Sequence, residues 1–144
     1  MKQITLRWLE DQVMVGSDSN NHSIVIGKTS DPDGAWLGVK PAELLLMAAA
    51  ACSSWDIIEI LTKQREPFKG LMVICTGEQQ QEAPWNFTHI HLKYIVSGDV
   101  NDEKLKRAIR LSEEKYCSVT NTLRKGTDIS SDYEIQPDYE KNNG

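Results

Sequence analysis

The most reactive side chains in this 144-residue chain are those of its three cysteines, Cys52, Cys75 and Cys117. A thiolate can attack a peroxide or a disulfide, and two thiols brought together can form and break a disulfide. The N-terminus shows no apolar stretch of signal-peptide length, and an odd number of cysteines does not suit a structural disulfide framework. No CxxC motif or paired Cys/His spacing predicts a structural zinc site.

The local surroundings of Cys52 and Cys117 differ. Cys52 lies in the apolar run 44–52, where a buried thiol can act as a small hydrophobic residue and burial raises its pKa. The carboxylate of Asp56, one turn later, would also oppose a thiolate there. Cys117 directly precedes Ser118, which can begin a short helix whose N-terminal amides would favour a thiolate at Cys117. From local sequence, a reactive and a structural role for Cys117 both remain open.

The other candidate residues favour structural roles. Cys75 lies in an alternating strand pattern and is interpreted as core packing. His89 and His91 share one face of a predicted strand and could chelate a metal, but no third ligand is apparent, which favours a solvated sheet face. Trp55 follows Cys52 by one helical turn and could wall an apolar pocket there. We therefore predict neither a metal nor a cofactor.

The elements that must position these residues follow from the period of the apolar pattern. Two helices are predicted, one from Pro41 to about Arg65 and one that Asn101 caps, and a short helix from Ser118 follows. Alternating patterns predict strands in six segments: 4–8, 13–15, 23–26, 71–76, 88–96 and 129–135. Because the strands occur in groups, this order favours an α+β fold with antiparallel pairing.

The first predicted helix is apolar on all sides over residues 44–52, so it must be buried on all sides. A chain of this size offers little surface to cover such a helix alone, which indicates a second subunit. Nine apolar residues are too few for a bilayer, which needs ~20. We therefore expect a cytoplasmic protein with no membrane partner.

Composition sets further limits on the class of protein. Apolar residues make up 40% and charged residues 26%, as in ordinary globular proteins. The net charge is -5 and no basic cluster stands out, so a nucleic-acid partner is not predicted. We predict one domain over residues 1–136 and a flexible polar tail over residues 137–144.

Two segments of the chain resemble the OsmC-like family, which includes osmotically inducible protein C and the organic hydroperoxide resistance proteins. They are Gly38–Asp56, with the sequence GVKPAELLLMAAAACSSWD, and Arg107–Val119, with the sequence RAIRLSEEKYCSV. The resemblance covers about Gly38 to Ile135. It implies the OsmC-like α+β fold, with antiparallel β-sheets around two long central helices, in an intertwined homodimer.

The resemblance also implies a thiol peroxidase that reduces organic hydroperoxides. Cys52 takes the place of the cysteine that attacks the peroxide, and Cys117 takes the place of the resolving cysteine. Cys52 would become a sulfenic acid, Cys117 would condense with it to a disulfide, and a dithiol reductant would restore both thiols. Neither a metal nor a flavin takes part in this chemistry.

An acidic residue near the start of the first helix departs from the family pattern. The family's peroxidases have a glutamate directly after the helix-opening proline, whereas here Ala42 holds that place and the acid is Glu43. Glu43 precedes Cys52 by nine residues, ~13 Å along a helix. It would have to act across the dimer, or it serves only the helix start.

The positive partner of the thiolate also departs from the pattern. The family's peroxidases use an N-terminal arginine, for which Arg7 is the candidate here, and the alternatives are Arg65, Arg107 and Arg110. The chain in this respect resembles the less characterised branch of the family. A stress-associated protein, or one that binds a small apolar ligand without efficient peroxidase turnover, therefore stays open as a second hypothesis.

Overall fold

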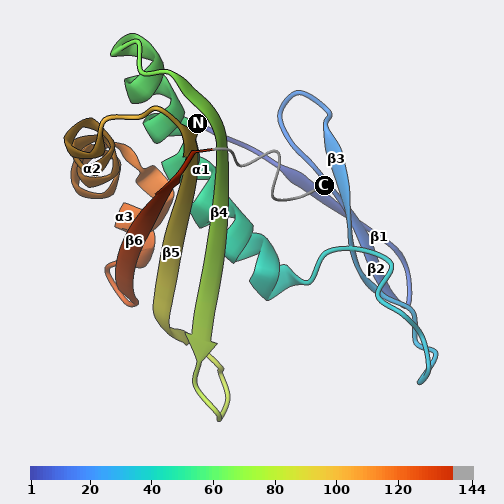
Figure 1. The fold of residues 1–144 in the computed structure, drawn as a ribbon. Coiled ribbons are helices and arrows are strands. Elements are labelled where there is room, and N and C mark those ends of the chain that lie inside the picture. Colours follow the sequence, from blue (N-terminus) through green and yellow to red (C-terminus); the bar gives the residue numbers. More distant parts are fainter. Residues whose placement is uncertain (138–144) are drawn as a thin grey trace. The chain divides into compact units, whose positions relative to one another are not determined.

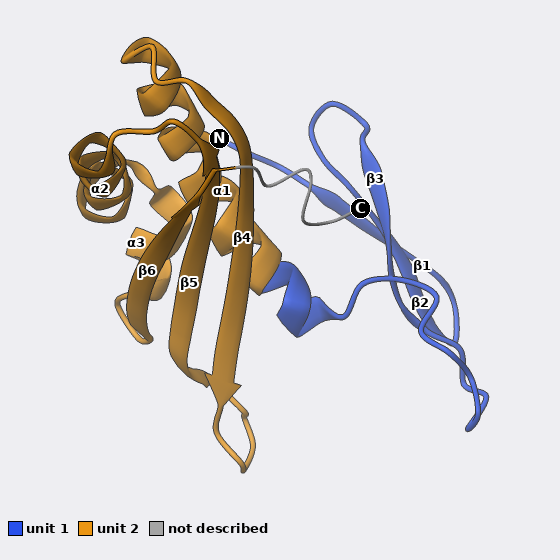
Figure 2. Cartoon of the chain, in the orientation of Figure 1, with its two compact units in different colours: residues 1–45 blue, residues 46–144 orange. Residues whose placement is uncertain are grey.

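The computed structural model describes residues 1–137, which form two compact units divided between Leu45 and Leu46 (Figure 2). The predicted tail lies outside the described residues except for Pro137. That residues 1–136 behave as one domain stays a prediction.

The N-terminal unit contains a three-stranded antiparallel sheet with the order β1-β2-β3. Its strands are β1 (Thr5–Glu10), β2 (Gln12–Ser17) and β3 (Ser23–Lys28), as the alternating pattern predicts. Gly27 has a φ of 103°, and a Cβ there would lie 1.8 Å from the carbonyl oxygen of Gln12. Only glycine can therefore hold this close pairing of β2 and β3.

The C-terminal unit contains a second sheet, with the order β4-β5-β6. Strands β4 (Phe68–Gln79) and β5 (Phe87–Gly98) are antiparallel, but β6 (Asp128–Gln136) pairs with β5 in parallel (Figure 1). The prediction of purely antiparallel pairing is wrong here. The connection from β5 to β6 holds three helical segments, long enough for the crossover that a parallel pair needs.

These three segments are α2 (Asp102–Leu111), the π-helical turn η1 (Ser112–Tyr116) and α3 (Ser118–Leu123). The side chain of Asn101 accepts a hydrogen bond from the Lys104 backbone N–H at 3.0 Å, which confirms the predicted cap of α2. The residue that caps α3 is Cys117.

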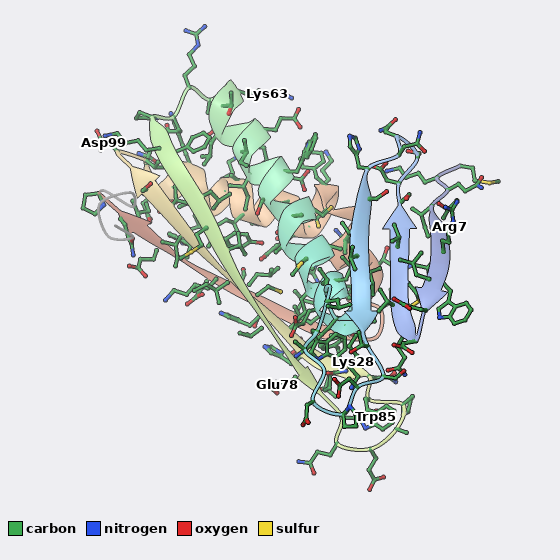
Figure 3. All side chains as sticks on the ribbon, turned by 90° about the vertical axis from the view of Figure 1, so that its right-hand side faces the viewer. Arg7, Lys28, Lys63, Glu78, Trp85 and Asp99 are labelled. Atoms are coloured by element: carbon green, nitrogen blue, oxygen red, sulfur yellow. The ribbon has the colours of Figure 1, made fainter. Side chains whose placement is uncertain are left out.

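Helix α1 (Pro41–Lys63) begins in the N-terminal unit and continues through the C-terminal unit. In the C-terminal unit its buried residues meet α2 on the sheet face that carries Leu92, Tyr94 and Val96. Lys63 and Asp99 lie at one end of this unit, and Glu78 and Trp85 lie at the other (Figure 3). The core therefore lies between the sheet and the two helices, and the opposite sheet face stays outside it.

Most of α1 is not covered within one chain. Its buried residues form a single stripe, Ala49, Ser53, Ile57 and Leu61, whereas Met47 is 51% exposed and Trp55 is 75% exposed. By length and composition α1 could cross a membrane, because an 18-residue window in it has a mean hydropathy of 1.7. A core helix of a soluble protein meets the same criterion.

Candidate active site

The two cysteines of interest come from different helices of the C-terminal unit. Cys52 lies in the middle of α1 and is partly buried, and Cys117 lies at the N-terminus of α3 and is completely buried. The π-helical turn η1 leads directly into Cys117, whose backbone N–H donates to the carbonyl oxygen of Ser112 at 2.8 Å. Single π-helical turns of this kind occur frequently at functional sites.

The start of α3 points its hydrogen-bond donors at the thiol of Cys52. The Ser118 hydroxyl oxygen lies 3.9 Å from the Cys52 sulfur, and the backbone N–H groups of Val119 and Ser118 and the Cys117 thiol act as hydrogen-bond donors that lower the pKa of Cys52. Cys117 is the second thiol of this group, and its own sulfur accepts from the backbone N–H of Thr120 at 3.4 Å. The fold thus brings together two cysteines that are 65 positions apart in the chain.

These contacts make the two thiols unequal. Partial burial by itself raises the pKa of Cys52, but the hydrogen bonds from Val119, Cys117 and Ser118 outweigh it and bring the pKa below its usual value. Burial raises the pKa of Cys117 above its usual value, and its interaction with Cys52 adds to the rise. Cys52 therefore ionises more readily than Cys117, which makes it the better nucleophile of the pair.

This order of acidity is opposite to the one that local sequence suggests. The N-terminal amides of α3 were expected to favour a thiolate at Cys117, and burial in the apolar run was expected to disfavour one at Cys52. Both influences are present, since burial raises the pKa of Cys52 and the backbone N–H of Thr120 lowers that of Cys117, but neither decides the outcome. Burial outweighs the amide at Cys117, and the hydrogen bonds from the start of α3 outweigh burial at Cys52. Cys117 occupies the capping position itself, where it is buried.

A second set of polar contacts fastens η1 to α1. The Ser112 hydroxyl donates to the Asp56 carboxylate at 2.9 Å and lies 3.4 Å from the carbonyl oxygen of Ser53. Ser112 and Ser53 are fully buried. Asp56, expected from the sequence to oppose a thiolate, thus holds the segment that carries Cys117.

The other predicted site residues lie elsewhere. Glu43 is exposed in the first turn of α1, where its carboxylate pairs with Lys40 at 3.5 Å. Arg107 and Arg110 line a basic surface cavity of about 590 Å³ whose lining includes neither cysteine, and Arg65 follows the end of α1 with a φ of 55°. Apart from burial, the main influences on the pKa of Cys52 are hydrogen bonds from Val119, Cys117 and Ser118.

The remaining candidates have structural surroundings. Burial raises the pKa of Cys75, which packs against the core. In residues 1–137, no group of three or more His, Cys, Asp or Glu side chains could hold a metal ion. Sequence reasoning missed the Ser118 hydroxyl and the two amides as partners of Cys52. The one signal available was that a serine directly follows a helix-capping cysteine.

Comparison with known proteins places the chain in a family. The model of the OsmC-like protein family matches residues 31–132. The chain belongs to the OsmC-like family. Protein YhfA of Escherichia coli strain K12 is 38% identical over 134 residues, which cover 92% of this chain and 97% of that protein.

Solved structures of this family share the fold. A hypothetical protein from Aquifex aeolicus is 28% identical, with a TM-score of 0.84 over 96% of this chain and 98% of that one. An organic hydroperoxide resistance protein OsmC from Legionella pneumophila is 12% identical, with a TM-score of 0.68 over 94% of this chain and 97% of that one. These likenesses confirm the predicted α+β OsmC-like fold and favour α1 as the core helix of a soluble protein.

Proposed function

We propose that this protein is a thiol-dependent peroxidase that reduces organic hydroperoxides through Cys52 and Cys117. The observation that carries the proposal is the inequality of the two thiols. The start of α3 lowers the pKa of the partly exposed Cys52, whereas burial raises the pKa of Cys117, and the hydroxyl oxygen of Ser118, next to Cys117 in the chain, lies 3.9 Å from the Cys52 sulfur. An attacking thiol needs a lowered pKa, because the thiolate is the nucleophile, and a resolving thiol must lie near the sulfenic acid with which it condenses.

The reaction proceeds in three balanced steps. The Cys52 thiolate attacks the O–O bond of the hydroperoxide, which yields a sulfenic acid on Cys52 and an alkoxide that leaves as the alcohol after taking a proton. The Cys117 thiol then condenses with the sulfenic acid, so that a disulfide forms and water leaves. A dithiol reductant reduces this disulfide by exchange and returns both cysteines to thiols.

The protein would work as a homodimer in the cytoplasm. The apolar side of α1 that one chain leaves exposed includes Met47, Trp55 and Ile58. An apolar helix surface of this kind requires a partner, and a second copy of the chain supplies one in the arrangement that the family resemblance implies. The apolar walls that the partner adds would favour organic hydroperoxides over hydrogen peroxide.

Glu43 would act at the site of the partner subunit, because about 13 Å separates it along α1 from Cys52 of its own chain. Its pairing with Lys40 is compatible with a role at the helix start alone. Replacing Glu43 with Gln separates the two roles, since only a role at the site lowers peroxide turnover while the unfolding free energy changes little.

The test is peroxide turnover by cysteine variants. Cys52→Ser should lose the reduction of tert-butyl hydroperoxide by a dithiol, whereas the matched control Cys75→Ser should keep it. Mass spectrometry of the peroxide-treated parent should find a disulfide between Cys52 and Cys117. If Cys52→Ser reduced the hydroperoxide at the parent rate, the proposal would be wrong.

A second candidate function is the binding of a small apolar ligand without efficient turnover. The N-terminal unit contains an apolar cavity of about 430 Å³, whose lining includes Ile4, Leu6, Ile24 and Leu44. This function predicts saturable binding of a fluorescent apolar probe, together with slow peroxide reaction in stopped-flow measurements. Rapid turnover with a dithiol would exclude it in favour of the peroxidase.

A further inference from the structure

The C-terminal sheet carries a row of polar side chains on the face opposite the helices. His89 and His91 on β5 alternate with the core residues, and on β6 the same face carries Asp128, Ser130 and Asp132. In the parallel register, His89 lies beside Asp128 and His91 lies beside Ser130. We call these five residues the histidine ladder.

A continuous chain of hydrogen bonds joins the ladder. His89 Nδ1 lies 3.1 Å from Asp128 Oδ2, and its Nε2 lies 2.9 Å from Ser130 Oγ. His91 Nδ1 lies 2.7 Å from the same Ser130 oxygen, and its Nε2 lies 3.0 Å from Asp132 Oδ1. The two rings are stacked with their centroids 6.4 Å apart. All four ring nitrogens are therefore engaged, and a metal would have to displace these contacts.

When both imidazoles are neutral, the ladder has one proton fewer than its four contacts need. Each of the four contacts needs one hydrogen between its two heavy atoms. Two ionised aspartates supply none, the Ser130 hydroxyl supplies one, and each neutral imidazole supplies one. Three protons are available for four contacts, so one contact would have no hydrogen. In that contact two lone pairs would face each other at hydrogen-bond distance.

We propose that the histidine ladder is a proton-binding site that holds one additional proton, shared between His89 and His91 through the Ser130 hydroxyl. In one arrangement the His91 imidazolium donates to Ser130 and Asp132, while Ser130 donates to neutral His89, which donates to Asp128. In the other arrangement the His89 imidazolium donates to Asp128 and Ser130, while Ser130 donates to neutral His91, which still donates to Asp132. Only the two contacts of Ser130 change direction. A relay of two protons converts the first arrangement into the second: one moves from His91 Nδ1 to Ser130 Oγ, and the hydroxyl proton moves on to His89 Nε2. Both arrangements satisfy all four contacts.

The charges around the ladder favour an added proton. On the same face, Glu78 of β4 lies beside His89 in the register, and Lys93 of β5 lies 3.6 Å from Glu134 of β6. With the two aspartates of the ladder, four carboxylates therefore accompany one lysine. A single positive charge is stabilised in this setting, whereas a second imidazolium would be repelled by the stacked ring of the first.

With the shared proton in place, side-chain hydrogen bonds hold β6 to β5 in addition to the backbone hydrogen bonds between the two strands. In the C-terminal sheet β6 is an edge strand, and it directly follows the helical crossover that carries Cys117. Loss of the proton breaks one of the four contacts, so β6 should be held less firmly at high pH.

The test is a count of protons on the ring nitrogens by two-bond ¹H–¹⁵N NMR as the pH is varied. The parent protein should show a pH range in which the two ladder rings together carry three N–H protons. In that range the ¹⁵N chemical shifts of each ring should be averages of the neutral and the charged form. Ser130→Ala removes the bridge and lets each ring be neutral with its own carboxylate. The pH range over which three N–H protons are counted should then narrow by about one unit, because one pH unit corresponds to about the free energy of one hydrogen bond.

Two controls make the result specific. Ser130→Thr keeps the hydroxyl and should keep the pH range of the parent. His22 pairs with Asp18 at 3.0 Å without a bridging hydroxyl, and its titration should be the same in every variant. The proposal is overturned if His89 and His91 lose their protons in one step in the parent, or if Ser130→Ala and the parent titrate alike.

Discussion

Removing the Ser118 hydroxyl should weaken the Cys52 thiolate measurably while leaving the fold intact. Ser118 is exposed at the first position of α3, and Ser118→Ala removes one of the donors that face the Cys52 sulfur. The backbone N–H groups of residues 118 and 119 stay in place. The variant therefore tests the hydroxyl alone.

The magnitude follows from the length of the contact. A hydrogen bond contributes about 0.5–1.5 kcal/mol, and the sulfur–oxygen distance of 3.9 Å favours the lower half of that range, about 0.7 kcal/mol. This corresponds to about half a pKa unit, or about a threefold loss of thiolate when the pH lies below the pKa. The remaining thiolate is more basic and reacts about 1.7-fold faster for a Brønsted coefficient of about 0.45. The net expectation is an approximately twofold slower reaction.

The assay is the second-order rate of Cys52 alkylation by iodoacetamide as a function of pH, read by mass spectrometry of the Cys52 peptide. The parent and Ser118→Ala should differ in the midpoint by about half a unit, with the variant higher. Ser54→Ala is the matched control, because the Ser54 hydroxyl donates to the Ala50 carbonyl oxygen at 2.7 Å. An unchanged midpoint in Ser118→Ala, or an equal shift in Ser54→Ala, would refute the reasoning.

Three further variants test other contacts. Cys117→Ala should raise the pKa of Cys52 by removing a donor, and peroxide should then leave a sulfenic acid that dimedone traps; a trapping yield equal to that of the parent would contradict this. Ser112→Ala should lower the free energy of unfolding by about 1.5–3 kcal/mol in urea titrations, because it breaks the hydrogen bond from the buried Ser112 hydroxyl to the partly buried Asp56 carboxylate. Hydrogen bonds from the Asn101 backbone N–H and the Lys104 side chain lower the pKa of Glu66 in the folded state, so their contribution to stability is present above the unfolded pKa of about 4.3 and is lost as the pH falls through the folded value. Glu66→Gln should therefore make the unfolding midpoint less dependent on pH between about pH 5 and pH 3, and an unchanged acid dependence would exclude this role.

The sequence predicts well those features that local chemistry determines. The Pro41 start of α1, the cap at Asn101 and the order of strands and helices all follow from residue type and period. The direction of β6 does not, because an alternating pattern is the same for parallel and antiparallel strands. The sequence also fails to predict which cysteine has the lower pKa, for a related reason. The amides that lower the pKa of Cys52 belong to residues 66 and 67 positions away, and only the fold brings them near.

The Cys117 peptide is held from both sides by hydrogen bonds. Its N–H donates to the Ser112 carbonyl oxygen at 2.8 Å, and its carbonyl oxygen accepts from the Asn121 side chain, also at 2.8 Å. The backbone around Cys117 therefore has little freedom to move. In the proposed reaction, any movement that brings the two sulfurs into a bond would therefore fall mainly on Cys52 and its side chain.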